Sequence, residues 1–183
     1  MKLKTIQYFL IIIFTVSFIS CERDDICPED VPTTPRLILE FFDISNQDNK
    51  KNVTKLFIQG VDNIAPLSGY LGDTNENTVE LPLKTDDNTT SFRFIRDYAI
   101  NDNGTPDDTS DDFQTGNEDI IIINYTAENV YVSRACGYKT IYKAVSVQFG
   151  EVNVTDRWIV LAQPLTDNQS IEDETTIHFK FFH

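Results

Sequence analysis

Apolar and polar residues alternate at every second position in several segments of this 183-residue chain. This period is that of a β-strand with one buried face, not that of an amphipathic helix. The alternation predicts the inward positions Leu37, Leu39, Phe41, Val79, Leu81, Leu83, Phe92, Phe94, Ile177, Phe179 and Phe181. Pro82 and His178 fall at outward positions, and the proline favours an edge strand.

Other segments are apolar at most positions or rich in β-branched and aromatic residues, so we expect more deeply buried strands there. These segments are 53–61, 120–126, 130–136, 140–149 and 157–163. Residues 127–129 suggest a turn, which predicts a central hairpin. Eight or nine strands with polar connections predict an all-β fold, a single antiparallel β-sandwich domain over residues 35–183, immunoglobulin-like or jelly-roll-like. A partly closed barrel is the alternative.

The N-terminus has the organisation of a secretory signal peptide. Lys2 and Lys4 precede an apolar stretch over residues 8–19, which is shorter than the roughly 20 residues of a membrane-spanning helix. We therefore interpret residues 1–20 as a signal peptide. An uncleaved N-terminal anchor is the alternative.

Phe18-Ile19-Ser20-Cys21 resembles a bacterial lipobox in a loose form, because Phe18 stands where leucine is more usual. The resemblance implies cleavage before Cys21 and attachment of acyl chains such as palmitate to this cysteine, which anchors the protein to a membrane. The acidic run Glu22-Arg23-Asp24-Asp25 resembles the signal that sends lipoproteins of Bacteroidota to the outer face of the outer membrane. Residues 21–34 are then a lipidated tether. The alternatives are a run that is merely solvated and a protein that faces the periplasm.

Charge and composition argue against several function classes. The 29 acidic and 15 basic residues give a net charge of −14, whereas a nucleic-acid binder needs a basic surface. Two histidines and three cysteines leave little room for a zinc cluster or a redox centre.

Cys27 and Cys136 remain once Cys21 is lipidated, and in an oxidising compartment we expect this pair to form a disulfide. Two free buried thiols are the alternative.

Residues 101–119 form the most acidic segment of the chain. Clustered carboxylates on a turn suit a hard cation such as calcium, although the spacing departs from that of the helix-loop-helix calcium loop. The candidate ligands are Asp107, Asp108, Asp111 and Asp112. The alternative is a solvated hairpin loop that keeps a sheet edge soluble.

Catalytic patterns are weak. The acidic run 172–174 and the pair Asp86-Asp87 suggest the two carboxylates of a glycoside hydrolase, but a charge run at a strand end is more often surface. The chain contains no Gly-x-Ser-x-Gly motif. We expect no enzymatic activity and no bound cofactor, with calcium as the one exception considered.

Five aromatic residues lie in the predicted central strands: Tyr125, Tyr131, Tyr138, Tyr142 and Trp158. Core packing is the default interpretation, since a glycan-binding stripe needs several of them on one exposed face. Arg134 and Lys139 flank Cys136, and we expect them to pair with carboxylates rather than to capture an anion.

Three parts of the chain resemble an uncharacterised lipoprotein family of flavobacterial-type Bacteroidota, the domain of unknown function 6452. They are the tether start 21–27 with 33–37, the central segment 130–141, and the segment 171–177. The resemblance implies a lipoprotein that contains both Cys27 and Cys136, which supports the disulfide. The family has no assigned activity, so no catalytic residue is carried over.

The sequence therefore suggests an outer-membrane or cell-surface lipoprotein that acts by binding. We expect an accessory protein that contacts another protein of the envelope. A glycan- or calcium-binding module is the alternative.

Overall fold

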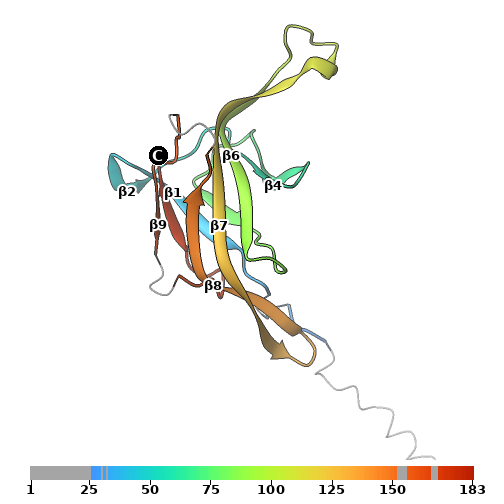
Figure 1. Cartoon of the computed structure of the whole chain (residues 1–183), viewed down its shortest axis with the longest axis vertical. Helices are drawn as coiled ribbons and strands as arrows, with labels where there is room; N and C mark the ends of the chain where they lie inside the picture. Colours follow the sequence, from blue (N-terminus) through green and yellow to red (C-terminus); the bar gives the residue numbers. More distant parts are fainter. Residues whose placement is uncertain (1–25, 30, 32, 152–155, 166–168) are drawn as a thin grey trace, which may run out of the picture. The chain divides into compact units, whose positions relative to one another are not determined.

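The computed structural model describes residues 26–29, 31, 33–151, 156–165 and 169–183 (Figure 1). Within these residues the regular structure is ten strands and one 3-10 turn, Thr109–Asp111. The strands are β1 (Leu37–Asp43), β2 (Asn46–Lys50), β3 (Phe57–Gly60), β4 (Pro66–Leu71), β5 (Thr78–Leu81), β6 (Thr89–Asn101), β7 (Phe113–Ser133), β8 (Gly137–Phe149), β9 (Leu161–Pro164) and β10 (Phe179–Phe182). No helix in this part of the chain is long and apolar enough to cross a membrane.

The chain divides into two compact units. The sandwich unit comprises residues 33–129 and 140–183. The hairpin unit comprises residues 130–139 together with the N-terminal residues up to 32. Strands β7 and β8 contribute residues to both units.

The sandwich unit contains two five-stranded sheets. In the first sheet the order is β2-β1-β10-β9, and β5 also pairs with β1. In the second sheet the order is β4-β3-β6-β7-β8 (Figure 1). The two sheets do not close into a barrel, so the predicted β-sandwich is confirmed and the barrel alternative is wrong.

One strand pair departs from the predicted antiparallel arrangement. β1 and β10 run parallel, with Leu39 opposite Phe179 and Phe41 opposite Phe181. The other pairs with a described register are antiparallel. Parallel strands need a long connection, and here nearly the whole domain connects β1 to β10.

The core lies between the sheets and consists mainly of the inward positions that the alternation predicted. The fully or almost fully buried members of that prediction are Leu37, Leu39, Phe41, Val79, Leu81, Leu83, Phe92, Phe94, Phe179 and Phe181. Ile177 is only half-buried. Phe41 lies at the centre, with ring centroids 6.0 Å from Phe181, 5.8 Å from Trp158 and 6.4 Å from Phe94.

Strands β1 and β10 are buried on both faces, where the alternation predicted one exposed face. Ile38, Phe42 and Phe182 are buried on the other face of the first sheet. His178, expected to face solvent, is only 3% exposed. Its Nδ1 accepts a hydrogen bond from the backbone N–H of Ile38 at 3.0 Å. The prediction was wrong because a strand's own sequence does not show what covers its second face.

The predicted turn at 127–129 is also wrong. β7 continues through these residues to Ser133, and the turn lies at 134–136. The Asn129 side chain accepts a hydrogen bond from the Thr140 hydroxyl at 3.0 Å, so the asparagine links β7 to β8 instead of forming a turn. Gly137, with φ of +70°, provides the left-handed backbone conformation that follows the turn.

Two other strands are shorter than predicted. The segment 53–61 contains only the four residues of β3, and the segment 157–163 contributes only its last three residues to β9, which continues to Pro164. Trp158 and Ile159 are buried ahead of β9 without belonging to it.

The edge-strand prediction for the segment with Pro82 agrees with the structure. Among the described strands, β5 pairs only with β1, and Pro82 is exposed just after β5 ends.

We predict that Phe41→Ala lowers the free energy of unfolding by about 3–5 kcal/mol, because it leaves a cavity at the centre of the aromatic cluster. Urea unfolding followed by circular dichroism measures this. Phe113→Ala is the control: Phe113 is 49% exposed, so its loss should stay within about 0.5 kcal/mol. Equal losses in the two variants would contradict the proposed core.

Burial lowers the pKa of His178, and the carboxylates of Asp173 and Glu174 oppose that shift without cancelling it. The folded state therefore binds fewer protons at this ring than the unfolded state does. The contribution of the neutral ring to the free energy of unfolding should therefore be fully present above the ordinary histidine pKa of about 6.5. It should be lost as the pH falls below that value. His183, whose pKa burial also lowers, acts in the same direction.

We predict that His178→Asn flattens this pH dependence, because the asparagine Oδ1 accepts the Ile38 N–H without titrating. The measurement is urea unfolding of both proteins at several pH values from about 7.5 to about 5. An unchanged slope in the variant would show that His178 does not contribute to it.

Candidate functional site

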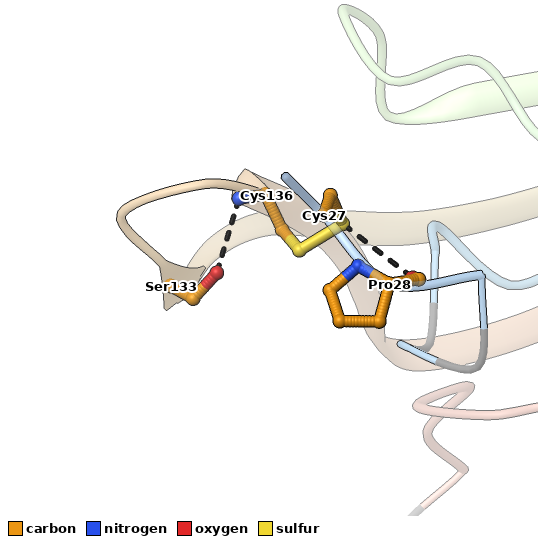
Figure 2. The surroundings of a disulfide bond; sticks show 4 residues. All are labelled: Cys27, Pro28, Ser133 and Cys136. Atoms are coloured by element: carbon orange, nitrogen blue, oxygen red, sulfur yellow. Dashed lines mark hydrogen bonds between the residues drawn. A yellow bond between two sulfur atoms is a disulfide. The ribbon is translucent and has the colours of Figure 1, made fainter. Parts of the chain in front are cut away.

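Cys27 and Cys136 form a disulfide in the hairpin unit (Figure 2). Their Cα atoms are 4.8 Å apart, which lies within the usual range for disulfides, and 109 positions separate them in the sequence. The backbone N–H of Cys136 donates to the Ser133 hydroxyl at 3.0 Å, which closes the turn that presents this cysteine (Figure 2). The predicted pairing is confirmed, and the free-thiol alternative is wrong.

The hairpin unit has an exposed aromatic and apolar surface. Tyr131 is 58% exposed and Tyr138 70%, and their rings meet edge to face with centroids 5.5 Å apart. Ile26, one residue before Cys27, is 76% exposed. A cavity of about 490 Å³ in this unit is lined by Ile26, Pro28, Val31, Tyr131, Ser133 and Arg134.

Arg134 does not pair as predicted within the part of the chain that the structure describes. It is exposed, and no ion pair there involves it. Lys139 does interact with another residue.

The other three aromatic residues considered for ligand binding belong to the core. Tyr125 and Tyr142 are buried edge to face, with centroids 4.9 Å apart, and Trp158 is buried beside Phe41. The Tyr142 hydroxyl donates to the Leu83 carbonyl at 3.0 Å, and burial raises the pKa of Tyr142 to about 12. These residues form no exposed stripe, so the core interpretation is confirmed.

The acidic segment 101–119 is mostly the loop between β6 and β7, and Asp108 and Asp111 bind groups of the loop itself. Asp108 accepts from the Ser110 N–H at 3.0 Å, and Asp111 accepts from the Thr105 hydroxyl at 2.8 Å and from an Asn103 amide. These hydrogen bonds hold the pKa of both aspartates below the usual range.

The structure does not gather the four calcium candidates into one site. Across the described residues, no three His, Cys, Asp or Glu side chains come close enough together to hold a metal ion. Asp107 and Asp108 are exposed, as is Asp111, and Asp112 is half-buried. Calcium binding by this loop stays a prediction without a geometric arrangement in its favour.

Asp119 belongs to the core and not to the loop. Its Oδ2 accepts backbone N–H groups of Trp158 at 3.1 Å and Ile159 at 2.8 Å, so it holds the segment before β9 against β7. Desolvation raises the pKa of this carboxyl. The period of two could have revealed this role, because Asp119 continues the buried positions Ile121 and Ile123 of the same strand.

Two of the carboxylates considered for hydrolysis, Glu172 and Glu174, are held by cations. Glu174 accepts from Arg36 at 2.6 Å and 2.9 Å, and Arg36 also pairs with Glu80. Glu172 pairs with Lys143. Hydrogen bonding from Arg36 holds the pKa of Glu174 below its usual range, which is the reverse of what a general acid needs.

The sandwich unit has a groove beside its second sheet. A cavity of about 590 Å³ lies beside the turn between β3 and β4, lined by Val61, Ile64, Leu67, Pro82, Lys84 and Phe92. Lys84 pairs with Asp62 at 3.1 Å, so the cation at the rim is already neutralised. Sequence reasoning did not single out this groove, because its lining comes from β3, β4, β6 and the loop after β5, which are separate in the sequence.

The end of the first sheet carries a second apolar surface. β9 is the last strand in the order of that sheet and pairs with β10 on one side. Val160, Leu161 and Leu165, on or beside β9, are exposed. An exposed strand edge with apolar side chains can pair with an extended segment of another protein. We name Val160–Leu165 the β9 edge.

We predict that Cys136→Ser lowers the free energy of unfolding by roughly 2–5 kcal/mol, because the bond closes a loop of more than 100 residues in the unfolded chain. Urea unfolding without reductant measures the loss. Cys21→Ser is the control and should leave the midpoint unchanged. A Cys136→Ser protein as stable as the wild type would exclude a stabilising disulfide.

Comparison with known proteins bears on residues 55–183. A family model with the description "Family of unknown function (DUF6452)" matches this range, which begins just before β3 and includes Cys136 but not Cys27. No curated protein and no solved structure matches the chain. The resemblance to the domain of unknown function 6452 is thus confirmed from residue 55 onward, while the resemblance of the tether start lies outside the match. Because the match covers more than half of the sequence, the chain belongs to the family of unknown function DUF6452.

Proposed function

We propose that this protein is an exported lipoprotein, anchored through Cys21 in the outer membrane, that acts by binding another protein of the envelope. The observation that carries the proposal of export is the disulfide between Cys27 and Cys136. Disulfides persist in oxidising compartments outside the cytoplasm. This agrees with the signal-peptide pattern of residues 1–20 and with the lipobox-like sequence that ends at Cys21.

The acidic residues after Cys21 support a position at the cell surface, with a periplasmic orientation as the alternative. The role that we propose is an accessory one. Two of the five carboxylates considered for hydrolysis, Glu172 and Glu174, are each engaged by a cation, which favours binding over catalysis.

The β9 edge is the proposed contact with the partner. In β9 the side of the strand away from β10 is the end of the sheet. Leu165 donates its N–H to the His178 carbonyl, so its backbone groups face β10. Because backbone groups alternate in direction along a strand, Ala162, three positions before Leu165, directs its N–H and C=O outward.

The side chains of the β9 edge fit a protein partner better than a glycan. Val160, Leu161 and Leu165 are aliphatic, whereas glycan sites rely on exposed aromatic faces. Natural edge strands are commonly blocked by charged residues, and β9 contains none, although Pro164 limits the edge at one end. An extended segment of the partner, added as a further strand, would cover both the backbone groups and the leucines.

We predict that a photocrosslinking amino acid at position 161 captures one envelope protein in cells of the native host. The same amino acid at Phe113, a position of similar exposure, should not capture it. Leu161→Lys should reduce recovery of that partner several-fold relative to Phe113→Lys, because a lysine blocks the added strand. Equal adducts at both positions, or none at position 161, would contradict the proposed contact.

A further inference from the structure

We infer that the hairpin unit lies against the lipid surface, with Tyr131, Tyr138 and Ile26 in the interfacial layer and Arg134 on lipid phosphates. This inference rests on the proposed lipid anchor at Cys21 and adds a second contact with the membrane. All four residues belong to one compact unit.

Covalent geometry limits how far this surface can move from the membrane. Cys27 follows Cys21 by six residues, which span about 20 Å when fully extended. The disulfide places the Cα of Cys136 only 4.8 Å from that of Cys27. The turn of the hairpin is therefore held within about 25 Å of the lipidated residue, although 115 positions separate Cys136 from Cys21 along the chain.

The side chains held in that range have the chemistry of a membrane interface. Tyrosine is enriched at the level of lipid headgroups, where its ring is buried and its hydroxyl stays hydrated. Tyr131 and Tyr138 are exposed in the described part of the hairpin unit, and Ile26 adds an aliphatic group that lines the same cavity as Tyr131. Arg134 has no ion pair within the described residues, and a guanidinium binds phosphate through two parallel hydrogen bonds.

The charges nearby determine the kind of lipid. Four acidic residues and one arginine lie at positions 22–29, so the surface is not a polybasic one. Attraction to anionic lipids therefore contributes little, and the contact rests on interfacial partition of the aromatic and apolar side chains. Zwitterionic phospholipids are the expected surface, and added salt should have little effect.

The test uses lipidated full-length protein in phosphatidylcholine and phosphatidylethanolamine vesicles that contain phosphatidylcholine brominated near the top of its acyl chains. Tyr131→Trp reports contact with lipid through loss of its fluorescence, and Tyr138→Trp is a second reporter. Phe113→Trp is the matched control, because Phe113 is also exposed but lies in the sandwich unit. The native Trp158 is buried, and its signal is subtracted with the wild type.

We expect the introduced indole to lose most of its fluorescence in the Tyr131→Trp and Tyr138→Trp proteins and to keep it in the Phe113→Trp protein. If both hairpin variants are folded and bound to vesicles but are not quenched, the inference is overturned and the anchor stays intact. Failure of the wild type to bind vesicles, or equal binding of Cys21→Ser, would instead overturn the proposed function.

A second arm tests the part played by the disulfide. Reduction of the bond in the Tyr131→Trp sample should restore the fluorescence of the introduced indole while the protein stays on the vesicles. Tyr131→Trp combined with Cys136→Ser should behave like the reduced sample. Quenching that survives both treatments would show that the disulfide does not hold the hairpin at the lipid surface.

Discussion

Strand β1 is the element on which the rest of the fold depends. It pairs with β2, β5 and β10, and it is buried on both faces. Phe41 on one face contacts Phe181 within the first sheet and Phe94 of the second sheet, so it links the two sheets. Because β10 comes from the end of the chain, its parallel pairing with β1 forms only when nearly the whole domain is present. The first sheet is thus built from strands that are distant in sequence, and its stability is a property of the complete domain.

The sequence predicted the faces of the strands better than their neighbours. Alternation identified Leu37, Leu39 and Phe41 as inward residues because the period of two is local. The burial of His178 and the parallel pairing of β10 could not be predicted. Both depend on which strand, distant in the sequence, lies beside the C-terminal segment. Asp119 continues the alternation of Ile121 and Ile123, but its charge groups it with the acidic segment 101–119. The candidate sites differ in the same way. The number of cysteines and the expected compartment predicted the disulfide, whereas the β9 edge can be recognised only from the order of the strands in the sheet.

The disulfide connects the fold to the proposed function. It joins Cys27, which lies six residues after the proposed lipidated residue, to the turn between β7 and β8. A lipid anchor on a free tether would leave the hairpin unit unrestrained, whereas this bond keeps Tyr131 and Tyr138 close to the anchor. The β9 edge belongs to the sandwich unit and is assigned to a protein partner. In this account the two units have separate roles, one toward lipid and one toward protein.

The central claim is that one molecule carries both the acylated Cys21 and the bond between Cys27 and Cys136. Mass spectrometry of tryptic peptides from native membranes, prepared without reduction, tests it directly. We expect peptide 21–23 with acyl chains on its first residue, and peptide 24–36 linked to peptide 135–139. A mature chain that begins before Cys21, an unmodified Cys21, or separate peptides with free thiols at Cys27 and Cys136 would contradict it.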